Sequence, residues 1–324
     1  MDITNKKSPV LIIGNGRLSH SVTVCLLQAG HTVTLQTNDV DDALKSINDH
    51  CTHLAKENFG ESSVQGIDVS LLNLTNVTGD KPVYEFGLAL TGENVAEKKA
   101  AICQLEKQVV PGAFICINSE SISLSVLQEA CSFPERLIGL NWTEPAHTTY
   151  FLEIIANSRT DKAVIGNLFS LAKNCWKKDP YLISNGIGIR AKMLGVMMRE
   201  AFYLVQNGYA SIEDIDRACR NDAGYYLPFS GNFRYMDLMG TYAYGLVMKD
   251  LNRELSTENS VPDFFKDIIE QGGLGMENNK GFYEYEEGDV DKWKAMFGKF
   301  SYQIQEIISR YPFSYRDKLF TAEL

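Results

Sequence analysis

The sequence lacks the features by which a protein meets a membrane or a nucleic acid. No apolar run approaches the ~20 residues that span a bilayer. A net charge of −10 with a pI near 5.1 leaves no basic face for a nucleic acid. Residues 1–8 are polar and lead directly into an apolar segment, so we expect no signal peptide and a cytoplasmic location. A local basic pocket for a small anionic ligand remains open.

Paired cysteines are also absent. The chain has no CxxC pair, which is the spacing typical of a zinc site or a redox motif. Several cysteines lie inside apolar runs such as "FICIN" at 114–118. We therefore predict reduced, buried thiols in a cytosolic protein, and no metal site. The seven cysteines are Cys25, Cys51, Cys103, Cys116, Cys131, Cys175 and Cys219.

Short apolar segments alternate with helical patterns through the first half of the chain. Strands that alternate with helices indicate a parallel, doubly wound sheet, and the first strand–turn–helix–strand unit is the usual opening of a dinucleotide-binding (Rossmann) fold. At 324 residues, the chain is long enough for two domains. The predicted helices are residues 20–28, 39–58, 94–109 and 123–131. The predicted strands are residues 10–13, 31–37, 69–75, 86–90, 114–118, 137–142 and 151–156.

The second half of the chain is predicted to be helical. Residues 192–206 form one long apolar helix pattern, and Ser211 is placed to cap the helix that follows. Further helices are predicted near 235–255 and 261–271, and only the aromatic "GFYEYE" at 281–286 resembles a strand. We predict a dinucleotide-binding domain at 1–183, a helical domain at 184–286, and an extension at 287–324 with one more amphipathic helix.

The turn after the first strand carries a glycine-rich motif. "GNGRLS" at 14–19 matches G-x-G-x-x-G except at its last position, Ser19. Gly14 permits the tight turn, and Gly16 lets a phosphate approach the backbone at the start of a helix, whose N–H groups and dipole favour an anion. A turn that is kept without a ligand is the alternative. The predicted cofactor-binding residues of this turn are Gly14, Asn15, Gly16, Arg17 and Leu18.

The end of the second strand departs from a usual NAD site. An Asp or Glu normally accepts hydrogen bonds from the ribose there, whereas this sequence has Gln36-Thr37-Asn38, with Thr37 at the expected position. Loss of a charged acceptor weakens nucleotide binding by roughly 1.5–3 kcal/mol, unless Asn38 or Asp39 substitutes. No Arg or Lys is near enough in sequence to suit a 2′-phosphate, so NAD is expected and NADP stays open.

Five ordered stretches resemble the 3-hydroxyacyl-CoA dehydrogenase family, in particular its 3-hydroxybutyryl-CoA dehydrogenases, over residues 10–286. They are "VLIIGNGRLSHSVTVCLLQAGHTVTL", "GENVAEKKAAICQLEKQVVPGAFICINSESISLSVL", "PERLIGLNWTEP", "REAFYLVQNGYASIEDIDRAC" and "GLGMENNKGFYEY". The resemblance implies a Rossmann domain followed by a helical domain like that of 6-phosphogluconate dehydrogenase, with NAD as cofactor and a small-molecule substrate such as an acyl-CoA. It also implies an oxidoreductase of fatty acid metabolism that forms a homodimer through its helical domain.

Several residues match family positions near the nicotinamide half of the cofactor. Glu93, Lys98 and Asn118 take the places of the family's Glu, its Lys and its strand-end Asn. The family then has a substrate-contacting Ser in an N-T-S-S stretch, where this chain reads "NSES" from Asn118. Glu120 therefore stands at the contact position, and Ser121 is kept as a predicted substrate-binding residue.

The family's catalytic dyad is altered in this chain. In the family, a His in "GLHFFNP" and a Glu twelve residues later carry the reaction, and the corresponding stretch here is "GLNWTEP" at 139–145. Asn141 replaces the His, Glu144 replaces the family's Asn, and Glu153 keeps the dyad Glu. Because Asn cannot take the hydroxyl proton, loss of the base is expected to slow hydride transfer by about 10²–10⁴-fold. His147, six residues after Asn141, is one candidate replacement.

Lys192 is a different candidate base. The stretch "GIGIRAK" at 186–192 is similar to the motif that carries the catalytic Lys of the related β-hydroxyacid dehydrogenases, although their Asn four residues later is Val196 here. Burial in an apolar pocket lowers the pKa of a Lys, and nearby carboxylates raise it. One hypothesis makes Lys192, with Glu153 and Glu120 or Glu144, an altered catalytic centre. The alternative is that Lys192 pairs with one of those carboxylates.

Two functional interpretations follow. The first is an NAD(P)-dependent enzyme like 3-hydroxyacyl-CoA dehydrogenase, which transfers hydride at the 3-hydroxyl of a small acyl-CoA or related hydroxy acid. The second is a catalytically impaired descendant that binds a nucleotide or an acyl-CoA. Glu120 and Glu144, as added carboxylates, are expected to repel an anionic group near the reacting carbons and to favour an amine-bearing or other polar hydroxylated substrate.

Overall fold

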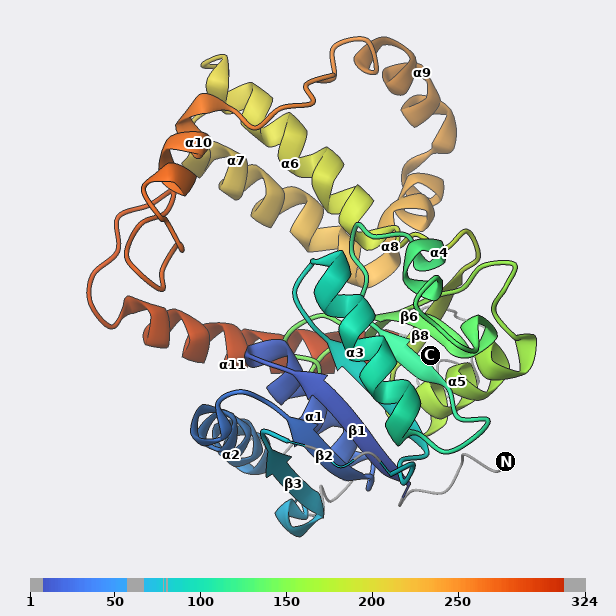
Figure 1. Cartoon of the computed structure of the whole chain (residues 1–324). Helices are drawn as coiled ribbons and strands as arrows, with labels where there is room; N and C mark the ends of the chain where they lie inside the picture. Colours follow the sequence, from blue (N-terminus) through green and yellow to red (C-terminus); the bar gives the residue numbers. More distant parts are fainter. Residues whose placement is uncertain (1–7, 57–66, 78, 80, 312–324) are drawn as a thin grey trace. The chain divides into compact units, whose positions relative to one another are not determined.

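The computed structural model describes residues 8–56, 67–77, 79 and 81–311, and the chain divides into two compact units (Figure 1). The first unit, Met1–Lys192, contains a β-sheet with helices. The second unit, Met193–Leu324, is helical in its described part. The structure confirms the predicted class, which is an α/β domain followed by a helical domain.

Eight strands form one sheet in the order β3-β2-β1-β4-β5-β6-β7-β8. Neighbouring strands are parallel except β6 and β7, which are antiparallel. The predicted parallel, doubly wound sheet is confirmed, with this one antiparallel pair as the exception. The strands are β1 (Pro9–Gly14), β2 (Thr32–Gln36), β3 (Leu72–Thr75), β4 (Phe86–Leu90), β5 (Ile115–Ile117), β6 (Leu137–Asn141), β7 (Phe151–Ile155) and β8 (Asp179–Ile183).

Helices connect most of these strands. Among them, α1 contacts α2, and α3 contacts α4. The sequence patterns do not predict α5 or β8, and residues Val69–Leu71 of the third predicted strand form a 3-10 helix instead. The helices of this unit are α1 (Arg17–Gln28), α2 (Val40–Lys56), α3 (Val95–Gln108), α4 (Leu124–Gln128) and α5 (Lys162–Asn174).

The central strands are buried on both faces, which is why they read as continuous apolar runs. All of β4, "FGLAL", is buried. Alternate residues of the strands, such as Leu11 and Ala89, pack with Ile102 and Leu105 of α3 and Leu127 of α4 in one core cluster. This packing fixes the carboxyl ends of β1, β4 and β5, where the glycine-rich turn and the next loops begin.

The second unit is built from helices with identifiable end signals. Ser211 caps α7 through a capping box, because its hydroxyl accepts from the Asp214 N–H at 3.1 Å while the Asp214 carboxylate accepts from the Ser211 N–H at 3.2 Å. The aromatic stretch at 281–286 forms no strand. No helix in the described part of the chain combines the length and apolar character needed to cross a membrane. The helices are α6 (Arg190–Gln206), α7 (Ile212–Ala218), α8 (Gly224–Met239), α9 (Thr241–Leu251), α10 (Asp263–Glu270) and α11 (Asp289–Arg310).

Candidate active site

The glycine-rich turn has the geometry that an anion-binding helix start requires. An added Cβ at Gly14 would lie 2.7 Å from the Leu90 carbonyl oxygen, so only glycine fits. Gly16, with φ at 78°, precedes α1, and no side chain caps this helix. Ser19 is tolerated in place of the third glycine because its buried hydroxyl donates to the Gly16 carbonyl at 2.8 Å. The start of α1, which no side chain caps, therefore suits a phosphate.

One side-chain amide connects this turn to the end of β2. Asn15 Oδ1 accepts from the Thr37 hydroxyl at 3.0 Å and from the Asn38 N–H at 2.7 Å. Asp39 caps the start of α2, where its Oδ1 accepts from the Asp42 N–H at 2.9 Å. The position that carries a ribose-binding carboxylate in a usual NAD site is thus filled by a buried hydroxyl that is already bonded to Asn15.

Glu93, Lys98 and Asn118 lie together between the ends of β4 and β5. The Lys98 side chain is fully buried, and its Nζ donates to the Asn118 carbonyl at 2.7 Å, to Asn118 Oδ1 at 3.0 Å and to Glu93 at 3.3 Å. Burial lowers the pKa of the Lys98 ammonium, while Glu93 opposes that shift. Glu93 Oε1 also accepts from the N–H groups of Ser121 at 2.8 Å and Ile122 at 3.1 Å, so it fixes the loop after β5.

Asn141, Glu153 and Tyr181 form a row across three neighbouring strands. Asn141 on β6 is opposite Glu153 on β7, which is in register with Tyr181 on β8. Asn141 Nδ2 donates to Glu153 Oε2 at 2.9 Å, and the Tyr181 hydroxyl donates to Glu153 Oε1 at 3.1 Å. Burial, and then Glu153, raise the pKa of the Tyr181 phenol. The sequence prediction missed Tyr181, and the only signal for it is the strand "DPYLI" at 179–183.

The buried groups of this row satisfy one another. Asn141 also accepts from the Ser119 N–H at 2.8 Å and donates to the Ser119 carbonyl at 2.9 Å, so its amide is engaged at both ends. Glu153 is completely buried and accepts two further bonds, from the N–H groups of Ile189 at 2.8 Å and Arg190 at 3.2 Å. Glu153 therefore anchors the start of α6, and Asn141 anchors the end of β5.

The two added carboxylates each have an arginine partner. Arg190 Nη1 lies 3.0 Å from Glu120 Oε1, and Arg17 Nε lies 3.0 Å from Glu144 Oε1. The neighbouring guanidinium partly offsets the charge of each carboxylate, so the expected repulsion of an anionic group is reduced. Sequence reasoning missed Arg190, whose partner is 70 residues away in the chain.

The two candidate replacement bases lie in different surroundings. Lys192 is exposed and makes no hydrogen bond or ion pair with any residue that the structure describes. The alternative in which Lys192 pairs with Glu120, Glu144 or Glu153 is therefore wrong. The His147 ring packs edge-on against the His50 ring of α2, with 4.7 Å between ring centres.

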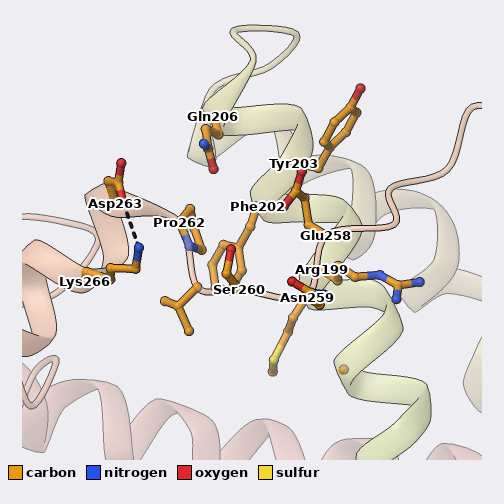
Figure 2. Close-up of a pocket in the computed structure, with 13 residues that line it drawn as sticks. Arg199, Phe202, Tyr203, Gln206, Glu258, Asn259, Ser260, Pro262, Asp263 and Lys266 are labelled. Carbon is orange, nitrogen blue, oxygen red and sulfur yellow. Dashed lines mark hydrogen bonds and ion pairs between the residues drawn. The ribbon is translucent and has the colours of Figure 1, made fainter.

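A separate pocket lies within the helical unit (Figure 2). It has a volume of about 440 Å³ between the C-terminal half of α6 and the segment that leads into α10. Phe202 lies inside it, while Lys266 forms an ion pair with Asp263 at its edge (Figure 2). None of the predicted site residues lines this pocket.

Family models match both parts of the chain. The NAD binding domain of 3-hydroxyacyl-CoA dehydrogenase matches residues 9–185, and its C-terminal domain matches residues 189–285. The chain belongs to the 3-hydroxyacyl-CoA dehydrogenase family. This confirms the resemblance seen in the sequence, and the first matched domain is of the NAD-binding type.

Individual relatives are distant in sequence. The human mitochondrial hydroxyacyl-coenzyme A dehydrogenase is 26% identical over 290 residues, which are 85% of this chain and 90% of that protein. The 5-formyl-3-hydroxy-2-methylpyridine 4-carboxylate 5-dehydrogenase of Mesorhizobium japonicum is 24% identical over 200 residues, 60% of this chain and 63% of that protein. The chain spans 39% of a rice peroxisomal fatty acid beta-oxidation multifunctional protein, at 25% identity over 87% of its own length.

One solved structure shares nearly the whole fold. A 5-formyl-3-hydroxy-2-methylpyridine 4-carboxylic acid 5-dehydrogenase, described as an NAD⁺-dependent dismutase, superimposes with a TM-score of 0.85. The match covers 94% of this chain and 99% of that chain at 20% sequence identity. At this identity the likeness establishes the fold and nothing finer.

Proposed function

We propose that the protein transfers hydride between NAD and the carbon that bears the 3-hydroxyl of a small acyl-CoA or related hydroxy acid. The observation that carries this proposal is the glycine-rich turn before α1, whose start no side chain caps, together with the buried Glu93–Lys98–Asn118 group. Gly14, Gly16 and the first N–H groups of α1 would hold the diphosphate, and the Glu93 group would face the nicotinamide half. When bound, NAD supplies the hydride acceptor, and the protein supplies position and charge.

The residues of the row have positional roles in this proposal. Asn141 exchanges no proton, and its amide holds the Ser119 peptide in place. Glu153 orients Asn141, Tyr181 and the start of α6 together. We therefore propose that the proton of the substrate hydroxyl leaves to solvent, without the imidazole that the family uses.

The first test measures binding and turnover separately on the full chain. Fluorescence titration with NADH and NADPH gives the dissociation constants. Absorbance of the reduced nicotinamide reports turnover of acetoacetyl-CoA and acetoacetate. We expect measurable NADH binding and slow turnover of at least one substrate. Binding without any turnover would support the catalytically impaired alternative, and absence of NADH binding would refute the proposed enzyme and leave only an acyl-CoA-binding descendant.

We propose a preference for NADH over NADPH, supported by charges at the end of β2. Asp39 precedes α2, and Asp41 and Asp42 lie in its first turn. Three carboxylates near the ribose position repel the 2′-phosphate of NADPH. NADPH is expected to bind at least about tenfold more weakly, which corresponds to roughly 1.4 kcal/mol.

We also propose that the protein is a cytoplasmic homodimer. All seven cysteines are free thiols, as a reducing compartment would keep them. The helical unit exposes large apolar side chains on α6, α8 and α9, and an apolar surface of this kind marks an association site. Examples are Met193, Val196, Phe233, Leu238, Tyr242 and Val247.

A further inference from the structure

Arg190 is held at both ends beside the Asn141–Glu153–Tyr181 row. Its backbone N–H donates to Glu153 Oε1 at 3.2 Å. Its guanidinium reaches the loop after β5, where Nη1 donates to Glu120 Oε1 at 3.0 Å and Oε2 at 3.1 Å. The side chain therefore keeps a fixed cation next to the buried row, and 30% of its surface is open to solvent.

The guanidinium has hydrogen-bonding capacity that the protein does not use. An arginine carries five N–H donors in a planar fork. Glu120 takes the donors of Nη1, while Nε and Nη2 of Arg190 have no partner among the described residues. The Nε–Nη2 edge is the geometry that binds a carboxylate through two parallel hydrogen bonds.

Aromatic rings border the same guanidinium. The guanidinium carbon of Arg190 lies 5.7 Å from the centre of the Phe151 ring. Phe151 and Tyr181 meet edge to face, with ring centres 5.8 Å apart. A short organic acid can thus place its carboxylate on Arg190 and its carbon chain against Phe151 and Tyr181, whose hydroxyl reaches Glu153.

We infer that Arg190 binds a free carboxylate of the substrate, so the substrate class is a small hydroxy or keto acid with an ionised carboxylate. This inference rests on the proposed function and narrows its substrate. A CoA thioester has no negative charge at its acyl carbonyl, so it would leave the Nε–Nη2 edge of Arg190 without a partner. Glu120 holds the cation in place between turnovers, and as a like charge it also limits the affinity for the acid.

Two substitutions with opposite expected effects test the inference. Isothermal titration of NAD⁺-saturated protein with acetoacetate, a pair with no hydride donor, gives the dissociation constant. Arg190→Met is expected to weaken acetoacetate binding by about tenfold to 100-fold through loss of a charged, two-bond contact. Glu120→Gln, which is nearly isosteric, is expected to tighten it by about fivefold, because a like charge roughly 6 Å away is removed.

Methyl acetoacetate, which has no charge, is the matched control ligand, and its affinity is expected to change less than about twofold in either variant. Arg190→Lys keeps the charge without the fork and is expected to be intermediate; it also serves if Arg190→Met does not fold. Unchanged acetoacetate binding in both Arg190 variants would overturn the inference, as would a higher kcat/KM for acetoacetyl-CoA than for acetoacetate in the unmodified protein. Absence of NADH binding would instead refute the proposed function.

Discussion

Asn141 uses its side-chain amide entirely within the protein. It bonds both the N–H and the carbonyl of Ser119 and one oxygen of Glu153, and only 1% of its surface is exposed. A histidine at this position would keep the bond to Glu153 but could not satisfy both groups of the Ser119 peptide. The substitution therefore removes a base and adds a structural bond at the same place.

Asn141→His is expected to raise the rate of hydroxyl oxidation and to lower the stability of the fold. A base with a pKa near neutrality raises the rate of hydroxyl oxidation by about 10²–10⁴-fold, and the rate should then show a neutral-pH limb that the unmodified protein lacks. The unpaired Ser119 peptide should lower the free energy of unfolding by about 1–3 kcal/mol. Stopped-flow pH profiles and urea titrations measure the two effects. A rate that stays at the original level and keeps the original pH profile would argue against the interpretation that the site lacks a base because Asn141 replaces the histidine.

His20 makes stability depend on pH. It is buried in α1, and neither ring nitrogen has a hydrogen-bond partner among the described residues. Burial lowers the pKa of His20 below 6.5, although Asp42 and Asp39 oppose this shift. Between the folded and unfolded pKa values the unfolded chain therefore binds more protons, so stability rises with pH and is lost as pH falls below 6.5.

His20→Leu is expected to reduce this dependence. The substitution removes two unsatisfied buried nitrogens, so stability near pH 7.5 should be unchanged or higher. The loss of stability between about pH 7.5 and pH 5 should be smaller than in the unmodified protein. Urea unfolding at several pH values gives both quantities, and an equal loss in the two proteins would show that other groups carry the effect.

At the scale of elements, the first half of the sheet is predictable from sequence and the last part is not. β1, β4 and β5 are short apolar runs between helical patterns, and the structure confirms them. The antiparallel direction of β7 leaves no trace in residue pattern, since Asn141 and Glu153 alternate with apolar neighbours in either direction. The residue pattern also gives no sign of Tyr181 or Arg190. The role of Tyr181 depends on strand register, and that of Arg190 depends on a loop partner far away in sequence.

The connection into α6 depends on the absence of a side chain at Gly188. An added Cβ there would clash with Glu153 Oε2 and lie 3.2 Å from Asn141 Nδ2. Gly188→Ala is therefore expected to displace Glu153 from the Ile189 and Arg190 N–H groups and to destabilise the fold by about 1–3 kcal/mol. Activity should fall with it.

Gly166→Ala is the matched control for this prediction. Gly166 is exposed inside α5, and an added Cβ has no atom within 4 Å. Alanine in an exposed helix interior should stabilise the protein by roughly 0.5–1 kcal/mol. Thermal and urea unfolding of the two variants should move in opposite directions, and a Gly188→Ala protein as stable as Gly166→Ala would contradict the packing argument.

At the scale of the whole molecule, the two units differ in how they bury apolar side chains. The sheet unit has a continuous buried apolar core, whereas Phe233 and Tyr242 of the helical unit are each 81% exposed. A stable homodimer buries about 800 Å² on each partner, and an apolar helix surface is suited to that purpose. The helical unit would then complete its core by association.

Phe233→Glu combined with Tyr242→Glu is expected to produce a monomer. Two charges in an apolar interface cannot be desolvated without partners, so association should weaken by several kcal/mol. Analytical ultracentrifugation should give twice the 36.3 kDa of the chain for the unmodified protein and the single value for the variant. Val77→Glu, at a 73% exposed apolar position on the sheet unit, is the control and should remain dimeric. An unmodified protein that sediments as a monomer would refute the homodimer. A double variant that still sediments as a dimer would show that the association surface lies elsewhere.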